Sequence, residues 1–125
     1  MARFPLAARS ETSSRTPYCP DQFDVIHLQF DPQAGREQDG KRYAFVLSPQ
    51  KYNSIARLCV LCPITTQVKG YPFEVAVPAG QKTTGVVLAD QIKSLDWNAR
   101  GSEFFESRPD IAPHVIGMIK ALLSL

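Results

Sequence analysis

The feature of this sequence that most constrains its fold is a succession of short apolar or alternating segments separated by polar turns. Each segment has a length of about four to ten residues, which is typical of a β-strand. Many short strands at regular intervals, followed by one helical pattern at the end of the chain, predict a mainly β domain built as a small antiparallel, partly closed barrel. The segments are residues 24–30, 42–47, 58–64, 71–77, 83–92, 94–97 and 100–108.

The hydrophobic pattern also predicts how deeply the strands are buried. Residues 24–30 alternate, with Ile26, Leu28 and Phe30 on one face, which predicts a half-buried strand. Residues 42–47 are more continuously apolar and predict a central strand. The same alternation recurs at Tyr71, Phe73, Val75 and Val77.

Two prolines mark the expected helices. Ser48 and Pro49 supply an N-cap and a first-turn proline for a short helical turn that ends near residue 54. Pro113 opens the final helix in the same way. One apolar face of that helix is expected to pack on the sheet, and it consists of Val115, Ile116, Ile119, Leu122 and Leu123.

Length and charge predict one domain with a short tail. A chain of 125 residues favours a single core. Residues 1–17 hold three arginines against one glutamate and show no periodicity, which predicts a disordered tail, with an organelle transit peptide as the alternative. The domain at 18–125 then holds 14 − 3 = 11 basic and 12 − 1 = 11 acidic residues. Because it is neutral, it would bind nucleic acid only through a local cationic groove.

The three cysteines predict neither a disulfide framework nor a metal site. Cys19, Cys59 and Cys62 form an odd set, which fits a reducing, cytoplasmic setting. Cys59 and Cys62 have CxxC spacing but lie in a predicted strand, where residues three apart point to opposite faces. No second pair and no nearby histidine completes a zinc site, so neither metal binding nor redox chemistry is expected.

A polar loop at 31–42 is the first candidate for function. It is longer than a tight hairpin, for which about two to five residues suffice. The loop offers the carboxylate of Glu37, the amide of Gln38 and the guanidinium of Arg42. These groups suit an anionic substrate that needs a base and charge stabilisation, although a solvated connection is the alternative. A second polar connection, 65–70, begins where a buried strand ends.

Five blocks of the sequence carry a further signal, and they follow one another along the chain. They are GREQDGKR at 35–42, VLSP and YN within 46–53, CPITTQ at 62–67, KGYPFEV at 69–75 and GVVLADQIKSLDW at 85–97. Together they resemble the signature of the MazF/PemK family of type II toxins. The resemblance covers the chain from about residue 18 to its C-terminus.

The resemblance implies a fold, an activity and partners. It implies a homodimeric, SH3-like barrel of the CcdB/Kid/MazF type with a C-terminal helix, located in the cytoplasm. Such toxins cleave single-stranded RNA, including mRNA, without a metal or other cofactor, and a labile antitoxin blocks their groove. Two departures stand out: Tyr43 follows Arg42 where the family usually has proline, and Phe23 stands where glycine is common.

RNA cleavage by the 2′-hydroxyl requires a base, stabilisation of a pentavalent phosphorus and a proton for the leaving 5′ oxygen. Glu37 is the candidate base, and Arg42 the candidate partner of the transition-state charge. Thr65 matches the family threonine that contacts the scissile phosphate, although a strand-end hydroxyl can also serve a backbone group. His27 and His114 are distant from both loops in sequence, so structural or solvated roles are expected for them.

Further polar residues are candidates for binding RNA along the same path. Phe30 and Tyr71 could stack on bases, but their strand positions predict core packing, and Trp97 is also expected to be structural. The candidate RNA-binding residues are Gln38, Lys41, Thr66, Gln67 and Lys69.

Two other functions fit the same scaffold. A non-catalytic gyrase poison of the CcdB kind would share the barrel, but its characteristic Trp-Gly-Ile ending is replaced here by Leu-Ser-Leu. An inactive paralogue or regulatory module is the other alternative, and Tyr43 is the one feature that favours it. The sequence does not identify the RNA word that is cut or the antitoxin that is bound.

Overall fold

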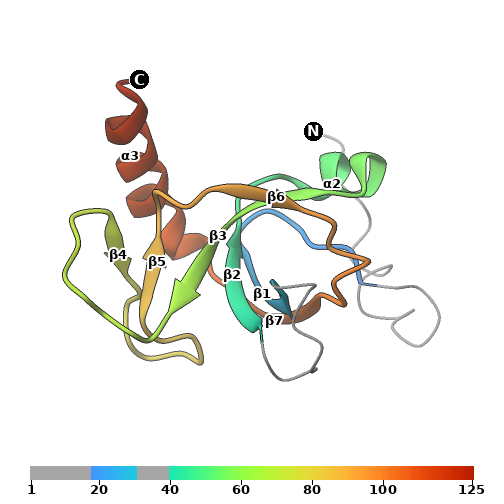
Figure 1. Ribbon diagram of the computed structural model, residues 1–125, viewed down its shortest axis with the longest axis horizontal. Helices are drawn as coiled ribbons and strands as arrows, with labels where there is room; N and C mark the ends of the chain where they lie inside the picture. The colour runs from blue at the N-terminus through green and yellow to red at the C-terminus, as the bar shows by residue number, and fades with distance from the viewer. Residues whose placement is uncertain (1–17, 31–39) are drawn as a thin grey trace.

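The computed structural model describes residues 18–30 and 40–125, which form one antiparallel sheet with short helices at its ends (Figure 1). The predicted tail at 1–17 and the candidate residues Glu37 and Gln38 lie outside the described residues. Within the described part, no helix is long and apolar enough to cross a membrane. The elements are β1 (Asp24–Gln29), β2 (Lys41–Val46), α2 (Gln50–Ala56), β3 (Cys59–Thr65), β4 (Glu74–Ala76), β5 (Val86–Leu88), β6 (Lys93–Leu95), β7 (Glu103–Ser107), the 3-10 helix η1 (Pro109–Ile111) and α3 (Ala112–Leu123).

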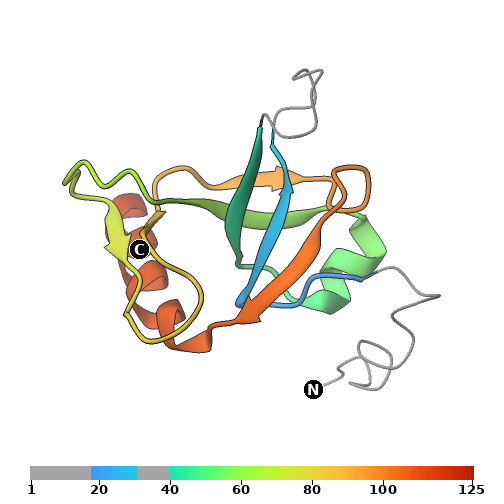
Figure 2. The same ribbon diagram turned by 90° about the horizontal axis from the view of Figure 1, so that it is seen from below.

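The sheet has seven strands, in the order β4-β5-β3-β2-β1-β7, with β6 paired to β3. This arrangement confirms the mainly β prediction and places β2 in the centre, between β1 and β3. Figure 2 shows β1, β2 and β7 side by side, with α3 beyond one end of the sheet. Among the described strands, the end strands β4 and β7 are not paired to each other, so the barrel is open there.

The long strand β3 connects the two halves of the sheet. One of its edges pairs with β2. Its other edge pairs with β6 near the start, where Cys59 lies opposite Leu95, and with β5 near the end, where Ile64 lies opposite Val87. The C-terminal end of β3 therefore lies between β2 and β5, and both neighbours can contribute side chains there.

Apolar side chains are buried on both faces of the sheet. Cys62 packs in one cluster with Val25 and residues of α3, whereas Cys59 packs in a second cluster with Ile26. The prediction that the two cysteines point to opposite faces is therefore confirmed. The half-buried prediction for the first strand is wrong at its start, because Val25 and Ile26 are both 0% exposed.

The start of α2 differs from the prediction. Pro49, not Ser48, is the N-cap residue, and its cap includes no side-chain hydrogen bond. The carboxylate of Asp21 accepts the Gln50 N–H at 3.0 Å instead, so a distant residue satisfies one free donor of the first turn. The Ser48 hydroxyl is buried and donates to Oδ1 of Asn53 at 2.6 Å.

The predicted apolar face of the final helix is only partly buried. Pro113 lies in the first turn as expected, and Val115 is fully buried. Leu122 and Leu123 lie near the end of α3 and stay exposed, Leu123 by 55%. The helix extends beyond the edge of the short strands β4 and β5 (Figure 1), so its last turn has no sheet beneath it.

The strands predicted at 71–77 and 83–92 are much shorter in the structure. Each contains only three residues, as β4 and β5. The predicted core position of Tyr71 is wrong, since this side chain precedes β4 and is 61% exposed. Trp97, by contrast, is buried as expected and donates its indole N–H to the Asn53 carbonyl at 2.9 Å.

Phe23, which stands where glycine is common, has a backbone conformation that suits glycine. Phe23 has a positive φ of 71°, a conformation that glycine adopts without strain. Its ring stacks on that of Phe45 with centroids 5.8 Å apart. Its backbone also donates to the Val46 carbonyl and accepts from the Arg108 N–H. These contacts hold the turn in place although its residue is not glycine.

Candidate active site

A cavity of about 660 Å³ opens where β2 begins and β3 ends. Its wall comes from these two strands, from the connection after β3, from the turn before β5 and from β7. The lining residues are Lys41, Arg42, Tyr43, Ile64, Thr65, Thr66, Gln67, Lys69, Tyr71, Glu74, Lys82, Thr83, Thr84, Leu88, Gln91 and Phe105. Six of the sequence-predicted site residues are among them: Lys41, Arg42, Thr65, Thr66, Gln67 and Lys69.

The pairing of β2 with β3 brings Arg42 and Thr65 together. Tyr43 lies opposite Ile64, the last pair of this antiparallel register, and Arg42 and Thr65 are the next residues along β2 and β3 beyond that pair. Both residues line the cavity. Directly opposed residues on one face lie about 5 Å apart at Cβ, so one phosphate group can contact both.

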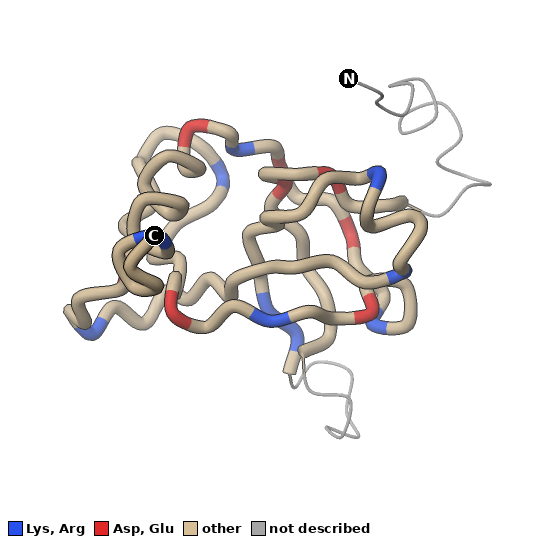
Figure 3. The backbone as a smooth tube through the Cα atoms, turned by 90° about the horizontal axis from the view of Figure 1, so that it is seen from above, with Lys and Arg blue, Asp and Glu red and all other residues tan. Residues whose placement is uncertain are grey.

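A second cation lies near Arg42. The Arg42 guanidinium carbon is 5.8 Å from the centre of the Phe30 ring, and the Lys93 ammonium of β6 is 5.5 Å from it. Figure 3 shows basic residues at the start of β2 and on β6. Phe30 is therefore partly buried beneath two cations, and it is not an open stacking surface.

The Thr65 hydroxyl is oriented by the backbone that follows it. Its oxygen accepts the Gln67 N–H at 3.0 Å, so its own proton stays available for another acceptor. The Thr65 carbonyl is packed against Gly85, where an added Cβ would lie only 2.2 Å from the carbonyl oxygen. The end of β3 is therefore confined by the turn before β5.

The connection from Thr66 to β4 is held by Glu74. Its carboxylate accepts the N–H groups of Lys69 at 3.1 Å and Gly70 at 2.9 Å. This carboxylate is thus engaged with the backbone, while the side chains of Gln67 and Lys69 remain exposed at the cavity.

The opposite wall is fixed through Glu106 of β7. The Glu106 carboxylate accepts the backbone N–H of Thr83 at 2.8 Å, the Thr83 hydroxyl and the backbone N–H of Lys82 at 3.3 Å. Burial alone would raise the pKa of Glu106, but the hydrogen bonds from Thr83, Arg108 and Lys82 lower it below the usual value. The Lys82 ammonium then lies 4.7 Å from the centre of the Phe105 ring.

Arg108 anchors this wall from the interior. Its side chain is 1% exposed and pairs with Glu106 at 3.1 Å and with Asp110 at 2.9 Å. It also donates to the Pro78 carbonyl at 3.2 Å. Hydrogen bonding to Asp110 raises the pKa of Arg108 although burial opposes this, and the same bond lowers the pKa of Asp110. Arg108 thus joins the turn at 78–83 to β7.

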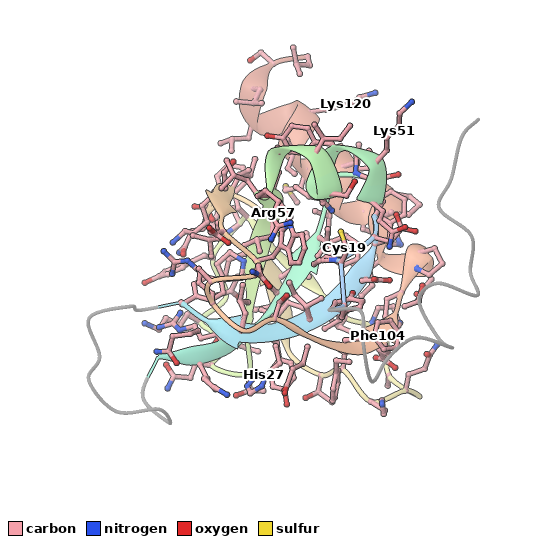
Figure 4. The ribbon with its side chains drawn as sticks, turned by 90° about the vertical axis from the view of Figure 1, so that its right-hand side faces the viewer. Cys19, His27, Lys51, Arg57, Phe104 and Lys120 are labelled. Atoms are coloured by element: carbon pink, nitrogen blue, oxygen red, sulfur yellow. The ribbon has the colours of Figure 1, made fainter. Side chains whose placement is uncertain are left out.

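The cavity favours anionic ligands. Among the described residues, four basic residues line it, against one acidic residue, Glu74, whose carboxylate is already hydrogen-bonded to backbone. Neither histidine is a lining residue: His27 packs against Tyr43 and His114 is exposed in the first turn of α3. In Figure 4, His27 lies on the side of the molecule opposite Lys51 of α2 and Lys120 of α3.

The lining residues that were not predicted as site residues from the sequence include Tyr43, Lys82 and Phe105. The sequence marked Tyr43 in one way, because it follows Arg42 where the family usually has proline. No feature of the sequence marked Lys82 or Phe105 as site residues. Both are ordinary residues in a turn and in a strand. They reach the cavity because β7 pairs with β1 and because Arg108 and Glu106 hold the turn at 78–83 against β7.

The cysteines contribute no reactive group to this site. Burial raises the pKa of the Cys59 and Cys62 thiols to about 12, so both are protonated near neutral pH. Within residues 18–30 and 40–125, no group of three or more His, Cys, Asp or Glu side chains is placed to hold a metal ion.

Comparison with known proteins reveals close relatives. Residues 21–124 match a family described as "PemK-like, MazF-like toxin of type II toxin-antitoxin system". Over 108 residues, 86% of this chain and 94% of the relative, the chain is 47% identical to the endoribonuclease toxin MazF of Escherichia coli K12.

Solved structures of MazF proteins are similar to this chain in both fold and sequence. A crystal structure of MazF from Deinococcus radiodurans has a TM-score of 0.76 and 47% sequence identity, covering 86% of this chain and 99% of that one. A MazE–MazF structure from the same organism has a TM-score of 0.77 and 45% identity, again with 86% and 99% coverage.

Proposed function

This chain belongs to the family of PemK-like, MazF-like toxins of type II toxin–antitoxin systems, and we propose that its cavity cleaves single-stranded RNA. It acts as an endoribonuclease, like the Escherichia coli relative named above. The observation that carries the assignment to this cavity is the strand register that brings Arg42 and Thr65 together, just beyond the pair Tyr43–Ile64, in a cavity lined by basic residues. The remaining steps follow from the chemistry that this arrangement can support.

The reaction is a transesterification within the RNA. The 2′ oxygen attacks the adjacent phosphorus and loses its proton to a base, while the bond from phosphorus to the 5′ oxygen breaks. The products are a 2′,3′-cyclic phosphate and a 5′-hydroxyl, which takes up one proton. No electrons are exchanged with a cofactor, so side chains that move protons and stabilise charge are sufficient.

Arg42 and Thr65 contact the reacting phosphate in this proposal. The Arg42 guanidinium is planar and permanently charged, and it can bind two phosphate oxygens at once. Stabilisation of transition-state charge by such a donor contributes several kcal/mol. The Thr65 hydroxyl accepts from Gln67 and can therefore donate its own proton to the same phosphate.

Glu37 remains the proposed base, although it lies outside the described residues. The described residues on either side of its loop support this role, because they are hydrogen-bonded to each other close to Arg42. The Phe30 N–H donates to the Gly40 carbonyl at 2.8 Å, and Gly40 lies two residues before Arg42. Glu74, the only carboxylate among the described lining residues, is engaged with two backbone N–H groups and is a poor alternative.

The polar lining residues bind the RNA strand on either side of the reacting phosphate. Lys41 and Lys69 supply charge for phosphates, whereas Thr66 and Gln67 are suited to sugar hydroxyls and base edges. Gln38 keeps the same proposed role outside the described residues.

We also infer the partners from the relatives. Structures of MazE–MazF complexes support an antitoxin protein as the partner of this chain. The exposed apolar residues at the end of α3, including Leu122 and Leu123, support a homodimer, because a second copy of the chain could cover them. The three cysteines, which form no disulfide in the structure, fit the reducing cytoplasm as its location.

The experiment is a cleavage assay on a long unstructured RNA in the presence of EDTA, with the fragment ends mapped. Wild type is compared with Arg42→Ala and Thr65→Ala, and Thr65→Ser tests whether a hydroxyl restores activity. Lys51→Ala removes a charge from the exposed surface of α2 and serves as the control.

We expect cuts at a recurring short sequence, cyclic phosphate ends, and loss of cleavage in both alanine variants while their folds are retained. Full activity in both alanine variants would refute the site assignment. Intact RNA together with inhibited DNA supercoiling would instead indicate a gyrase poison.

A further inference from the structure

A row of three aromatic rings crosses β1, β2 and β7 at the edge of the cavity. The ring of Tyr43 lies between His27, at 4.5 Å between centroids, and Phe105, at 4.8 Å. Tyr43 and Phe105 line the cavity, and Tyr43 is 37% exposed. The row therefore presents a rigid aromatic surface to the cavity.

Tyr43 is adjacent to Arg42 in the same strand. Tyr43 shares its face of the sheet with His27 and Ile64. Arg42 begins on the other face, but both residues line the cavity at the start of β2. Their Cα atoms are about 3.8 Å apart, as in any trans peptide. A nucleotide whose phosphate contacts Arg42 thus has a base within reach of Tyr43.

The surroundings of the row favour a nucleic acid base over an apolar protein segment. The Lys82 ammonium lies over Phe105, and Lys41 and Arg42 directly precede Tyr43 in the sequence and line the same cavity. Cations around an aromatic surface match a ligand that carries both a flat ring and a phosphate. The neighbouring rings hold Tyr43 in one orientation, so binding costs little conformational entropy.

We propose that Tyr43, supported by Phe105, is the stacking surface for a base next to the cleaved phosphate, and that Lys82 contacts a phosphate of the same strand. Tyr43 thereby contributes to the choice of RNA sequence in this chain, at a position where the family usually has proline. The proposal rests on the proposed ribonuclease function and adds a base-binding subsite to it.

The test compares variants that keep bulk but differ in aromatic character. Tyr43→Phe retains the ring, whereas Tyr43→Leu and Phe105→Leu remove one ring each. Phe104→Ala is the control, because Phe104 is an exposed ring in the same strand as Phe105 that points to the other face and packs edge-on against Tyr18. Binding is measured with single-stranded 2′-O-methyl RNA, which cannot undergo 2′ attack, and cut sites are mapped on unmodified RNA.

We expect Tyr43→Leu to weaken binding of the 2′-O-methyl RNA about five- to hundredfold, the range for loss of one base stack, and to change the cut-site pattern. Phe105→Leu should also weaken binding and change the cut sites. If Tyr43→Leu fails to fold, the test relies on Phe105→Leu. Phe104→Ala should resemble wild type in both measurements, and Tyr43→Phe, which keeps the ring, should bind the RNA more tightly than Tyr43→Leu.

The outcomes separate this proposal from the ribonuclease function. If wild type cleaves RNA but Tyr43→Leu keeps its affinity and cut sites, the stacking subsite is refuted and the ribonuclease function stands. Loss of dimer or antitoxin binding with unchanged RNA binding would also refute it, by assigning the row to a protein interface. If wild type cleaves no RNA, both proposals fall.

Discussion

Gly85 lies in the turn before β5 with a positive φ of 101°. Replacing it with alanine would place a Cβ 2.2 Å from the Thr65 carbonyl oxygen and 2.9 Å from its carbonyl carbon. Nonbonded heavy atoms rest about 3.5 Å apart, so the turn and the end of β3 would have to separate by about 1 Å. Both contacts are to backbone, which cannot turn aside as a flexible side chain can.

Gly80 provides a matched control for this change. It has a similar φ of 107°, but an added Cβ there meets nothing within 4 Å. Gly80→Ala therefore carries the cost of positive φ alone, about 1–2 kcal/mol of unfolding free energy. Gly85→Ala adds the clash, which at the usual cost of overpacking is about 1–3 kcal/mol more.

The same displacement should reduce activity beyond the loss of stability. A shift of about 1 Å in a reacting group can lower the rate about a hundredfold, and Thr65 lies at the displaced strand end. The measurements are denaturant unfolding for stability and initial rates of RNA cleavage at a temperature where both variants are folded. Equal stability and equal rates for Gly80→Ala and Gly85→Ala would refute the claim that this close approach positions Thr65.

Three further predictions concern stability and reactivity. Asn53→Ala should lower the unfolding free energy by about 3 kcal/mol in denaturant titrations, because its buried side chain makes three hydrogen bonds whose partners would be left unsatisfied. Wild type should lose stability in thermal melts as the pH falls below 4.5, the ordinary pKa of a glutamate side chain. Burial raises the pKa of Glu106, but hydrogen bonds from Thr83 and Arg108 outweigh burial and lower it. Glu106→Gln should therefore flatten the dependence of stability on pH. A thiol reagent at pH 8 should modify only one of the three cysteines of the native protein rapidly, because burial raises the pKa of Cys59 and Cys62 to about 12, and all three should react in denaturant.

Much of the sheet could be predicted because strand periodicity depends on local sequence. The alternation of β1, the central place of β2 and the opposed faces of Cys59 and Cys62 all follow from side chains that alternate across a strand. Arg42 could be selected as a candidate because it ends a polar loop where an apolar strand begins, whereas Thr65 was selected because it matches the family threonine. That they come together depends on the register between strands, which the structure provides.

The predictions that failed depended on partners distant in sequence. Ser48 resembled an N-cap, but the carboxylate of Asp21 takes that role across the fold. Leu123 has helical periodicity, yet it is exposed because the short strands end before the last turn of α3. Periodicity shows which side chains share a face, but it does not show whether another element covers that face.

The sequence by itself therefore determined the strand pattern, the family blocks and the charged loop ends, since all three are properties of neighbouring residues. Only the tertiary structure decided what closes the cavity. Lys82 and Phe105 reach it because Glu106 and the buried Arg108 bind the turn at 78–83 to β7. Those bonds join groups more than 20 residues apart, and no local propensity encodes such pairings.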